Sequence, residues 1–304
     1  MEKVLINNKE YNYITNYKND EKLRNDLHIL TQKIWGFDFE KWYKSGYWED
    51  NCLLYSLSDG HKIVSHITVS VIDFIILGKK KKFVQLGTVT TDEEYRKQGL
   101  NKFLLEKVLH EWKDKSDLIY LFANDSVLNY YPPFGFVRVN EYIATKKIES
   151  TKNAYNVRKL DINNQFDHEL LYKKAKNAIP LFNISMVDNA GLIMFYCNYF
   201  EKFSFKEKLY YIESLDIVIV AEYTDNDCIL YDILSTQEVE TEVIINAMCT
   251  EQTQNVLMYF MPKDNKDYEI KLLKEDDTTL FVMGDEQKLF KEEKLIFPIY
   301  LIHK

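Results

Sequence analysis

The chain has 304 residues, 46% hydrophobic and 28% charged, a length that predicts two domains with ample apolar material for their cores. The net charge of −8 argues against a nucleic-acid partner, and the sequence has no apolar run long enough to span a bilayer. Four scattered cysteines and no apolar signal-peptide core predict a cytoplasmic protein without a disulfide framework, zinc site or other metal.

The first predicted elements are a short strand at residues 11–16 and a helix that begins near Asn19-Asp20, a pair suited to an N-cap. A second short helix is expected at residues 39–43. Strands follow at residues 52–57 and 63–77, joined by the hairpin turn Asp59-Gly60. The sequence between helix and strand is rich in rings, which form either the edge of a core or an aromatic wall for a substrate: Trp35, Phe37, Phe39, Trp42, Tyr43 and Trp48.

Residues 84–105 predict a buried strand, a charged loop and the start of a helix. The helix begins near Gly99, and its apolar residues recur at spacings of three and four. The first N–H groups of a helix have no intrahelical partner and carry partial positive charge, so they suit a phosphate. Gly99 permits close approach to the backbone, and Arg96 and Lys97 add positive charge. This stretch therefore predicts a phosphate or pyrophosphate site, although a plain strand-to-helix connection with a solvated loop would give the same pattern.

Residues 117–146 predict a strand that ends at Asn124, a short helix up to Tyr131, and a closing strand at residues 136–146. Pro132 and Pro133 stop the short helix, since proline cannot donate a backbone hydrogen bond. Asn124, with the two residues after it, is a typical helix cap.

The segment Arg96-Lys97-Gln98-Gly99-Leu100-Asn101 resembles the pyrophosphate loop R/Q-x-x-G-x-G/A of the GCN5-related N-acetyltransferases (GNAT). Asn101 departs from the small residue of the last position. Tyr131 follows Asn124 by seven residues and precedes a Gly-Phe pair, which is similar to the family's later motif. The resemblance implies an α/β (α+β) fold with a mixed, mostly antiparallel sheet flanked by helices, in two tandem domains. The arrangement is closest to the enhanced-intracellular-survival type, but the chain is too short for that type's third, sterol-carrier-like domain.

The resemblance also implies the chemistry. We expect an N-acetyltransferase that uses acetyl-CoA as co-substrate and a primary amine as acceptor, with Tyr131 as the general acid that protonates the leaving thiolate. The residues expected to hold the cofactor are Val89, Thr90, Thr91, Arg96, Lys97, Gln98, Gly99, Leu100, Asn101 and Asn124. A non-catalytic acyl-CoA sensor or recruiting module is the alternative, and Tyr131 favours the enzyme. The sequence does not single out a base for the amine, and the candidates besides water are Glu40, His66, Gln85 and Glu94.

The second half, residues 151–304, echoes the element order of the first half, residues 1–150, and predicts a degenerate acetyltransferase-like domain. Its strand-to-helix junction, residues 235–242, contains Glu238, Glu240 and Glu242 and no glycine, arginine or lysine. Because carboxylates repel a pyrophosphate, we expect this half to bind no acyl-CoA. Its expected role is to wall off the acceptor pocket or to form a homodimer.

Overall fold

The computed structural model describes residues 1–60, 62–149, 155–200, 204–298 and 300, and its strands form two sheets. The first, sheet A, has nine strands. In spatial order they are β1 (Glu2–Ile6), β2 (Lys9–Thr15), β3 (Cys52–Asp59), β4 (Lys62–Ile76), β5 (Lys79–Thr91), β6 (Leu118–Ala123), β16 (Thr279–Met283) and β7 (Val137–Arg138), with β10 (Ile184–Val187) paired to the end of β4.

The second, sheet B, has seven strands. In spatial order they are β15 (Glu269–Leu272), β8 (Tyr142–Lys147), β14 (Asn255–Met258), β13 (Asp227–Leu234), β12 (Ile217–Thr224), β11 (Leu209–Ile212) and β9 (Val157–Lys159). The pairs are antiparallel except β5–β6 in sheet A and β13–β14 in sheet B, which are parallel.

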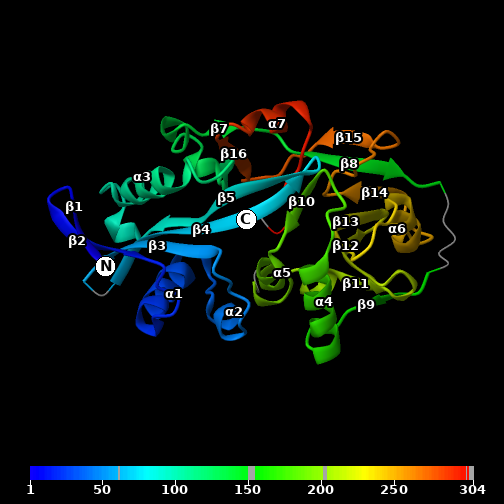
Figure 1. The fold of residues 1–304 in the computed structure, drawn as a ribbon, viewed down its shortest axis with the longest axis horizontal. Helices are drawn as coiled ribbons and strands as arrows, with labels where there is room; N and C mark the ends of the chain where they lie inside the picture. Colours follow the sequence, from blue (N-terminus) through cyan, green and yellow to red (C-terminus); the bar gives the residue numbers. More distant parts are fainter. Residues whose placement is uncertain (61, 150–154, 201–203, 299, 301–304) are drawn as a thin grey trace.

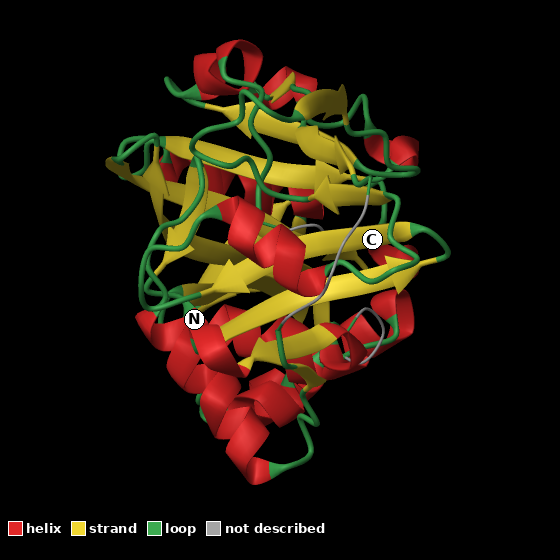
Figure 2. Ribbon diagram, turned by 90° about the vertical axis from the view of Figure 1, so that its right-hand side faces the viewer, coloured by secondary structure: helices red, strands yellow, loops and turns green. Residues whose placement is uncertain are grey.

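Helices cover both faces of sheet A. In Figure 1, α1 and α2 lie below β3 and β4, and α3 lies above β4 and β5; Figure 2 shows helices packed around the strands of both sheets. The helices are α1 (Glu21–Trp35), α2 (Glu40–Lys44), α3 (Leu100–Trp112), α4 (Gln165–Asn177), α5 (Ala190–Met194), α6 (Thr241–Met248) and α7 (Gln287–Glu292). None of them has the length and apolarity that a membrane-crossing helix needs, as far as the described residues extend.

Local sequence explains where α1 begins and ends. The Asp20 side chain accepts a hydrogen bond from the backbone N–H of Leu23 at 3.1 Å, as its predicted N-cap role requires. Gly36 ends the helix with φ of 73°, a left-handed conformation that glycine adopts without strain. Leu27 and Leu30, spaced three apart, are buried against the sheet.

Strands of both halves occur in each sheet: besides β10, which pairs with β4, each half inserts one strand into the other half's sheet. In sheet A, β16 from the second half lies between β6 and β7, and in sheet B, β8 from the first half lies between β14 and β15. Both inserted strands follow a parallel pair, β5–β6 or β13–β14, so the two sheets share one plan. The predicted single closing strand at residues 136–146 was wrong for this reason: the chain leaves sheet A after β7 and enters sheet B as β8.

The halves also share a hydrophobic core. The face of sheet A under α1 and α2 packs Leu27 and Trp42 in one cluster with Phe195 and Phe297 of the second half. Trp42 donates its indole N–H to the backbone carbonyl of Gly191 at 2.9 Å. The opposite face, under α3, has a separate core that includes Leu104 and Val108. Each sheet contains strands from both sides of residue 150, so the sheets do not mark a domain boundary there. The division of the chain into two domains at residue 150 therefore stays a prediction.

Candidate functional site

A cleft opens where two parallel strands separate. β5 and β6 pair only from Phe83 to Gln85 and from Leu118 to Tyr120. Beyond these pairs, residues 86–91 and 122–124 line the two sides of a cavity of about 440 Å³. The C-terminal end of α1 and the segment after β6 complete its walls. The lining includes Ile34, Trp35, Arg96, Asn101, Ser126, Val127, Tyr130 and Tyr131.

A bulge in β5 shapes the middle of this cleft. His66 pairs with Thr90 and Thr68 pairs with Gly87, so Thr88 and Val89 together face the single residue between His66 and Thr68. Thr88 has φ of 44°, which is rare for a β-branched residue. Strained backbone of this kind concentrates at functional sites, where the surrounding structure holds it in place.

One end of the cleft lies at the start of α3, where backbone donors are unpaired. Gly99 is the N-cap with φ of 81°, and the first intrahelical hydrogen bond is donated by Phe103 to the Gly99 carbonyl at 3.0 Å. The N–H groups of Leu100, Asn101 and Lys102 precede that bond and have no partner in the described part of the chain. These donors, at the positive end of a helix dipole, fit a pyrophosphate.

The loop before α3 is held in place from two sides. Asn7, in the turn between β1 and β2, donates from Nδ2 to the backbone carbonyl of Gln98 at 2.8 Å. Tyr11 donates its hydroxyl to Oε1 of Gln98 at 3.1 Å. Arg96 is half-exposed and donates from Nε to the Thr91 carbonyl at 3.3 Å, so its guanidinium lies at the rim of the cleft.

Asp92 anchors the entry to this loop. Its buried carboxylate lies 3.0 Å from Lys33 Nζ and 2.8 Å from Lys62 Nζ, and it also accepts a hydrogen bond from the Glu94 N–H. Burial opposes ionisation of Asp92, but Lys62 and Lys33 lower its pKa to about 2. The carboxylate is therefore charged at neutral pH and neutralised by its own lysines, so it does not repel an anion at α3.

Two neighbouring tyrosines line the cleft. Tyr131 is 5% exposed, packs edge-on against Tyr130 and Phe136, and has no hydrogen-bond partner for its hydroxyl among the described residues. Burial raises the pKa of Tyr131 well above its usual range, so the phenol keeps its proton at neutral pH. Tyr130 differs because its hydroxyl donates to Oδ1 of Asn101 at 2.9 Å.

Asn124 lines the cleft at the end of β6, and its side chain is held by the second half. Nδ2 donates to the Asp277 carboxylate at 2.9 Å and to the Asp277 carbonyl at 3.3 Å. The neighbouring Asp125 N–H donates to the same carboxylate at 2.7 Å. Local patterns do not point to Asp277, because it lies 153 positions after Asn124 in the chain.

A smaller cavity of about 30 Å³ adjoins the cleft, and both include Gly87 and Thr88 in their linings. The aromatic residues Phe37, Phe39 and Trp42 line it from the first half. The second half supplies the remaining apolar wall: Leu192, Phe195 and Tyr196. The aromatic cluster is thus both core edge and cavity wall, and the second half closes that wall.

A row of buried polar side chains starts at the junction of the two cavities. The Thr88 hydroxyl bonds to that of Thr68, which bonds to Nε2 of His66 at 2.8 Å. Nδ1 of His66 bonds to Ser56 at 2.8 Å, and Ser56 bonds to Tyr17 at 2.6 Å. Burial lowers the pKa of His66 to about 3, so its ring is neutral and one ring nitrogen accepts a hydrogen bond.

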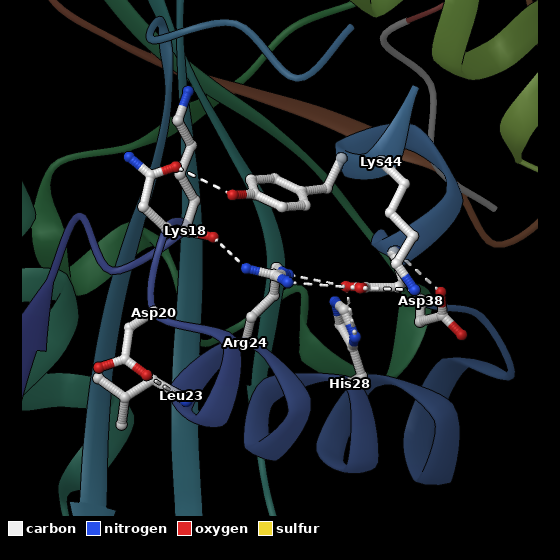
Figure 3. A network of polar contacts seen from close by, with 10 residues as sticks. Lys18, Asp20, Leu23, Arg24, His28, Asp38 and Lys44 are labelled. Atoms are coloured by element: carbon white, nitrogen blue, oxygen red, sulfur yellow. Dashed lines mark hydrogen bonds and ion pairs between the residues drawn. The ribbon is translucent and has the colours of Figure 1, made fainter. Parts of the chain in front are cut away.

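None of the four side chains considered as the amine's base belongs to the lining of the cleft described above. Glu40 is held by Arg24, whose Nε lies 2.7 Å away, and Lys44 (Figure 3). Arg24 lowers the pKa of Glu40 to about 2, which makes it a poor base. His66 is buried and neutral, Gln85 is buried beside the small cavity, and Glu94 lies on the surface 3.5 Å from a lysine. The lining contains no Asp, Glu or His.

The equivalent gap of sheet B, between β13 and β14, is occupied by the chain itself. After the paired stretch of these strands, residues 178–183 cross the gap. Ile179 donates its N–H to the Ser235 carbonyl at 2.8 Å, beside the end of β13. Asn183 donates to the Met261 carbonyl at 2.9 Å, beside the end of β14. No side-chain cap holds the start of α6, which has Glu238 and Glu240 before it and Glu242 in its first turn.

The structure brings most of the sequence-predicted site residues into one cleft. Those that line it are Val89, Thr90, Thr91, Arg96, Asn101, Asn124 and Tyr131. Lys97, Gln98, Gly99 and Leu100 lie outside the lining, in the turn before α3 and in its first residue, where Leu100 has a buried side chain and an available N–H. Sequence reasoning missed Thr88, Tyr130 and Asp277. No group of three His, Cys, Asp or Glu side chains suited to a metal occurs within the described ranges.

Comparisons with known proteins agree with this geometry. The family described as acetyltransferase (GNAT) domain matches residues 23–139. Among solved structures, Eis1 from Mycobacterium abscessus is 8% identical with a TM-score of 0.56 and covers 90% of this chain and 73% of its own. A GCN5-related N-acetyltransferase from Kribbella flavida is 16% identical with a TM-score of 0.54 and covers 90% and 70%. At these identities the likeness shows the fold, and a search of curated proteins gives no significant match.

Proposed function

We propose that the chain transfers an acetyl group from acetyl-CoA to a primary amine, because residues 23–139 match the acetyltransferase (GNAT) domain family. The observation that carries the proposal is the cleft, whose lining includes both Asn101, with its unpaired N–H at the start of α3, and Tyr131. A cavity of about 440 Å³ is in the size range of small-molecule sites.

The first half would hold acetyl-CoA along this cleft. The N–H groups at the start of α3, with Arg96 and Lys97, would bind the pyrophosphate. The edge of β5 from Val89 to Thr91 no longer pairs with β6 and would bind the pantetheine arm in the manner of an added strand. Asn124, on the opposite wall of the cleft, would also bind this arm.

Tyr131 would act as the general acid. The amine nitrogen forms a bond to the thioester carbonyl carbon, the carbon–sulfur bond breaks, and the Tyr131 hydroxyl gives its proton to the sulfur. The proton lost by the amine restores the phenol through water. The high pKa of Tyr131 supports this role because it keeps the proton available until negative charge develops on sulfur.

The acceptor would enter beside Thr88, where the cleft meets the small aromatic cavity. No carboxylate or imidazole among the lining residues can take the proton, so we infer that the amine reacts as the neutral base and that water removes its proton. The second half contributes part of the aromatic wall, which supports a role in closing the acceptor side.

We also infer a reducing, cytoplasmic setting. The four cysteines Cys52, Cys197, Cys228 and Cys249 are free and buried, which fits thiols that stay reduced. A homodimer stays a proposal for the second half.

A thiol-release assay tests the proposal. Purified protein and acetyl-CoA are mixed with polyamines, aminoglycosides, amino acids or peptides, and amine-dependent release of CoA is expected with at least one of them. Saturable CoA binding without release from any amine would favour the sensor. Absence of CoA binding would reject both functions.

A further inference from the structure

We propose that Asp277, a residue of the second half, is a positioning residue for the cofactor cleft of the first half. The inference rests on the proposed function, because it assigns to Asp277 the task of presenting Asn124 to acetyl-CoA. Asp277 does not line the cleft itself and would act through the turn that follows β6.

Three hydrogen bonds connect Asp277 to this turn. Its carboxylate accepts from Asn124 Nδ2 at 2.9 Å and from the Asp125 N–H at 2.7 Å, and its carbonyl accepts from the same Nδ2 at 3.3 Å. The next strand, β16, pairs Thr279 with Ala123, which fixes the distance between the two segments. The Asp277 backbone has φ of 55°, a left-handed conformation that aspartate tolerates better than most residues. The link is therefore built from both the side chain and the backbone.

The chemistry of these groups decides the orientation of the Asn124 amide. A carboxylate and a carbonyl can only accept hydrogen bonds, so the NH₂ of Asn124 must face Asp277. Oδ1 then faces away and has no partner in the described part of the chain. Asn124 thereby offers a hydrogen-bond acceptor in the wall of the cleft, suited to an amide N–H such as those of the pantetheine arm.

Asp277 also replaces Asn124 as the cap of the next turn. Asn124 is the N-cap of the 3₁₀ turn Asp125–Val127, but its side chain makes no cap hydrogen bond to this turn. The unpaired Asp125 N–H is instead satisfied by the Asp277 carboxylate. The same segment leads to Val127, Tyr130 and Tyr131 in the cleft, so Asp277 holds the start of the segment that carries the proposed acid.

Calorimetric titration of the full chain with CoA tests this without an acceptor amine. D277A should weaken CoA binding about tenfold, the effect of losing roughly one charge-assisted hydrogen bond. D276A is the matched control, because Asp276 is the exposed neighbour and its carboxylate makes no contact with the turn; it should bind CoA like the wild type. D277N keeps one carbonyl oxygen as acceptor and should lie between them.

A double-mutant cycle separates positioning from general stability. If Asp277 acts through Asn124, D277A should change CoA affinity by less than twofold in the N124A background. Full additivity of the two substitutions, or wild-type CoA affinity of D277A, would overturn the inference. If D277A is unfolded by its thermal midpoint, D277N and N124A/D277N decide by the same criteria. A wild-type chain that binds no CoA would reject the proposed function itself, which is a different result.

Discussion

Tyr130 and Tyr131 are neighbours in one cleft, yet their surroundings differ in a way that can be tested. Tyr131 has a buried phenol with no partner among the described residues, whereas the Tyr130 hydroxyl is used on Asn101. Burial raises the pKa of both phenols, that of Tyr130 to about 12. A hydroxyl without a partner can donate its proton to a leaving group. A hydroxyl that already donates within the protein must first break that hydrogen bond.

We therefore predict that Y131F lowers kcat about 100-fold, since general acid catalysis contributes about that much or more, and leaves acetyl-CoA binding nearly unchanged. Y130F is the matched control and should keep most of the activity. Steady-state thiol release and CoA calorimetry measure both effects. A larger loss in Y130F than in Y131F would move the acid role to the other tyrosine.

Glu141 is a buried carboxyl at the crossing between the two sheets. It lies between β7 and β8, and its Oε1 accepts from the Phe297 N–H at 2.8 Å. Burial raises the pKa of Glu141 to about 8, and the nearby Glu275 acts in the same direction. The folded chain therefore binds this proton more tightly than the unfolded chain does.

The free energy of unfolding that Glu141 contributes therefore falls as the pH rises. A raised folded-state pKa contributes stability that is complete below pH 4.5 and is lost as the pH rises through about 8. E141Q cannot ionise and keeps an oxygen for Phe297. We predict that the melting temperature of E141Q, relative to that of the wild type, is higher at pH 9 than at pH 5. Thermal scans at both pH values check this, and parallel curves for the two proteins would show that Glu141 does not titrate in this window.

At the scale of elements, the start of α3 depends on the backbone conformation of one glycine. Gly99 has φ of 81°, and a Cβ there would meet Asn7 at 3.6 Å, an ordinary contact. A substitution would therefore act through backbone strain of about 1–2 kcal/mol and not through a clash. Relief of that strain would turn the N–H groups of Leu100 and Asn101 away from the pyrophosphate.

We predict that G99V weakens CoA binding at least tenfold in calorimetry. Gly78 has nearly the same φ, 79°, in the hairpin between β4 and β5, and a Cβ there meets nothing within 4 Å. G78V thus imposes similar strain away from the cleft and should bind CoA normally. Equal CoA affinity of the two variants would remove Gly99 from the pyrophosphate site.

For the whole molecule, the sheet plan occurs twice, and the gap between the parallel strands is open in sheet A but filled in sheet B. The gap of sheet A forms the cleft, and the gap of sheet B is crossed by residues 178–183. Because these residues bond to both sides of their gap, opening it would break backbone hydrogen bonds. Glu238 and Glu240, which precede α6, add negative charge where a pyrophosphate would need donors.

We predict that calorimetry on the full chain gives one CoA bound per chain. The measurement requires the whole chain, since β8 and β16 are exchanged between the sheets and neither half keeps its own closing strand. A stoichiometry of two would show that the second half also binds the cofactor. The Gly99 variant provides the control, because it should abolish most of the single binding event.

The sequence by itself determined the features that depend on near neighbours. The N-cap of α1 at Asn19-Asp20, the hairpin before β4 and the start of α3 near Gly99 were predictable because each is set by a few consecutive residues. The sheet type followed from the same local patterns and from the family resemblance. Most of the predicted cofactor residues lie in one cleft for this reason, although their roles stay predictions.

Only the tertiary structure decided the contacts that join distant parts of the chain. The exchange of β8 and β16, the filling of the second gap and the bond from Asn124 to Asp277 have no local signal, because hydrogen bonds between strands can form at any separation in the chain. The bulge at Thr88 depends on its register with β4, which the sequence of β5 alone does not fix. Short-range propensity determines which segments form helices and strands. Long-range packing determines which of these helices and strands come together at the cleft.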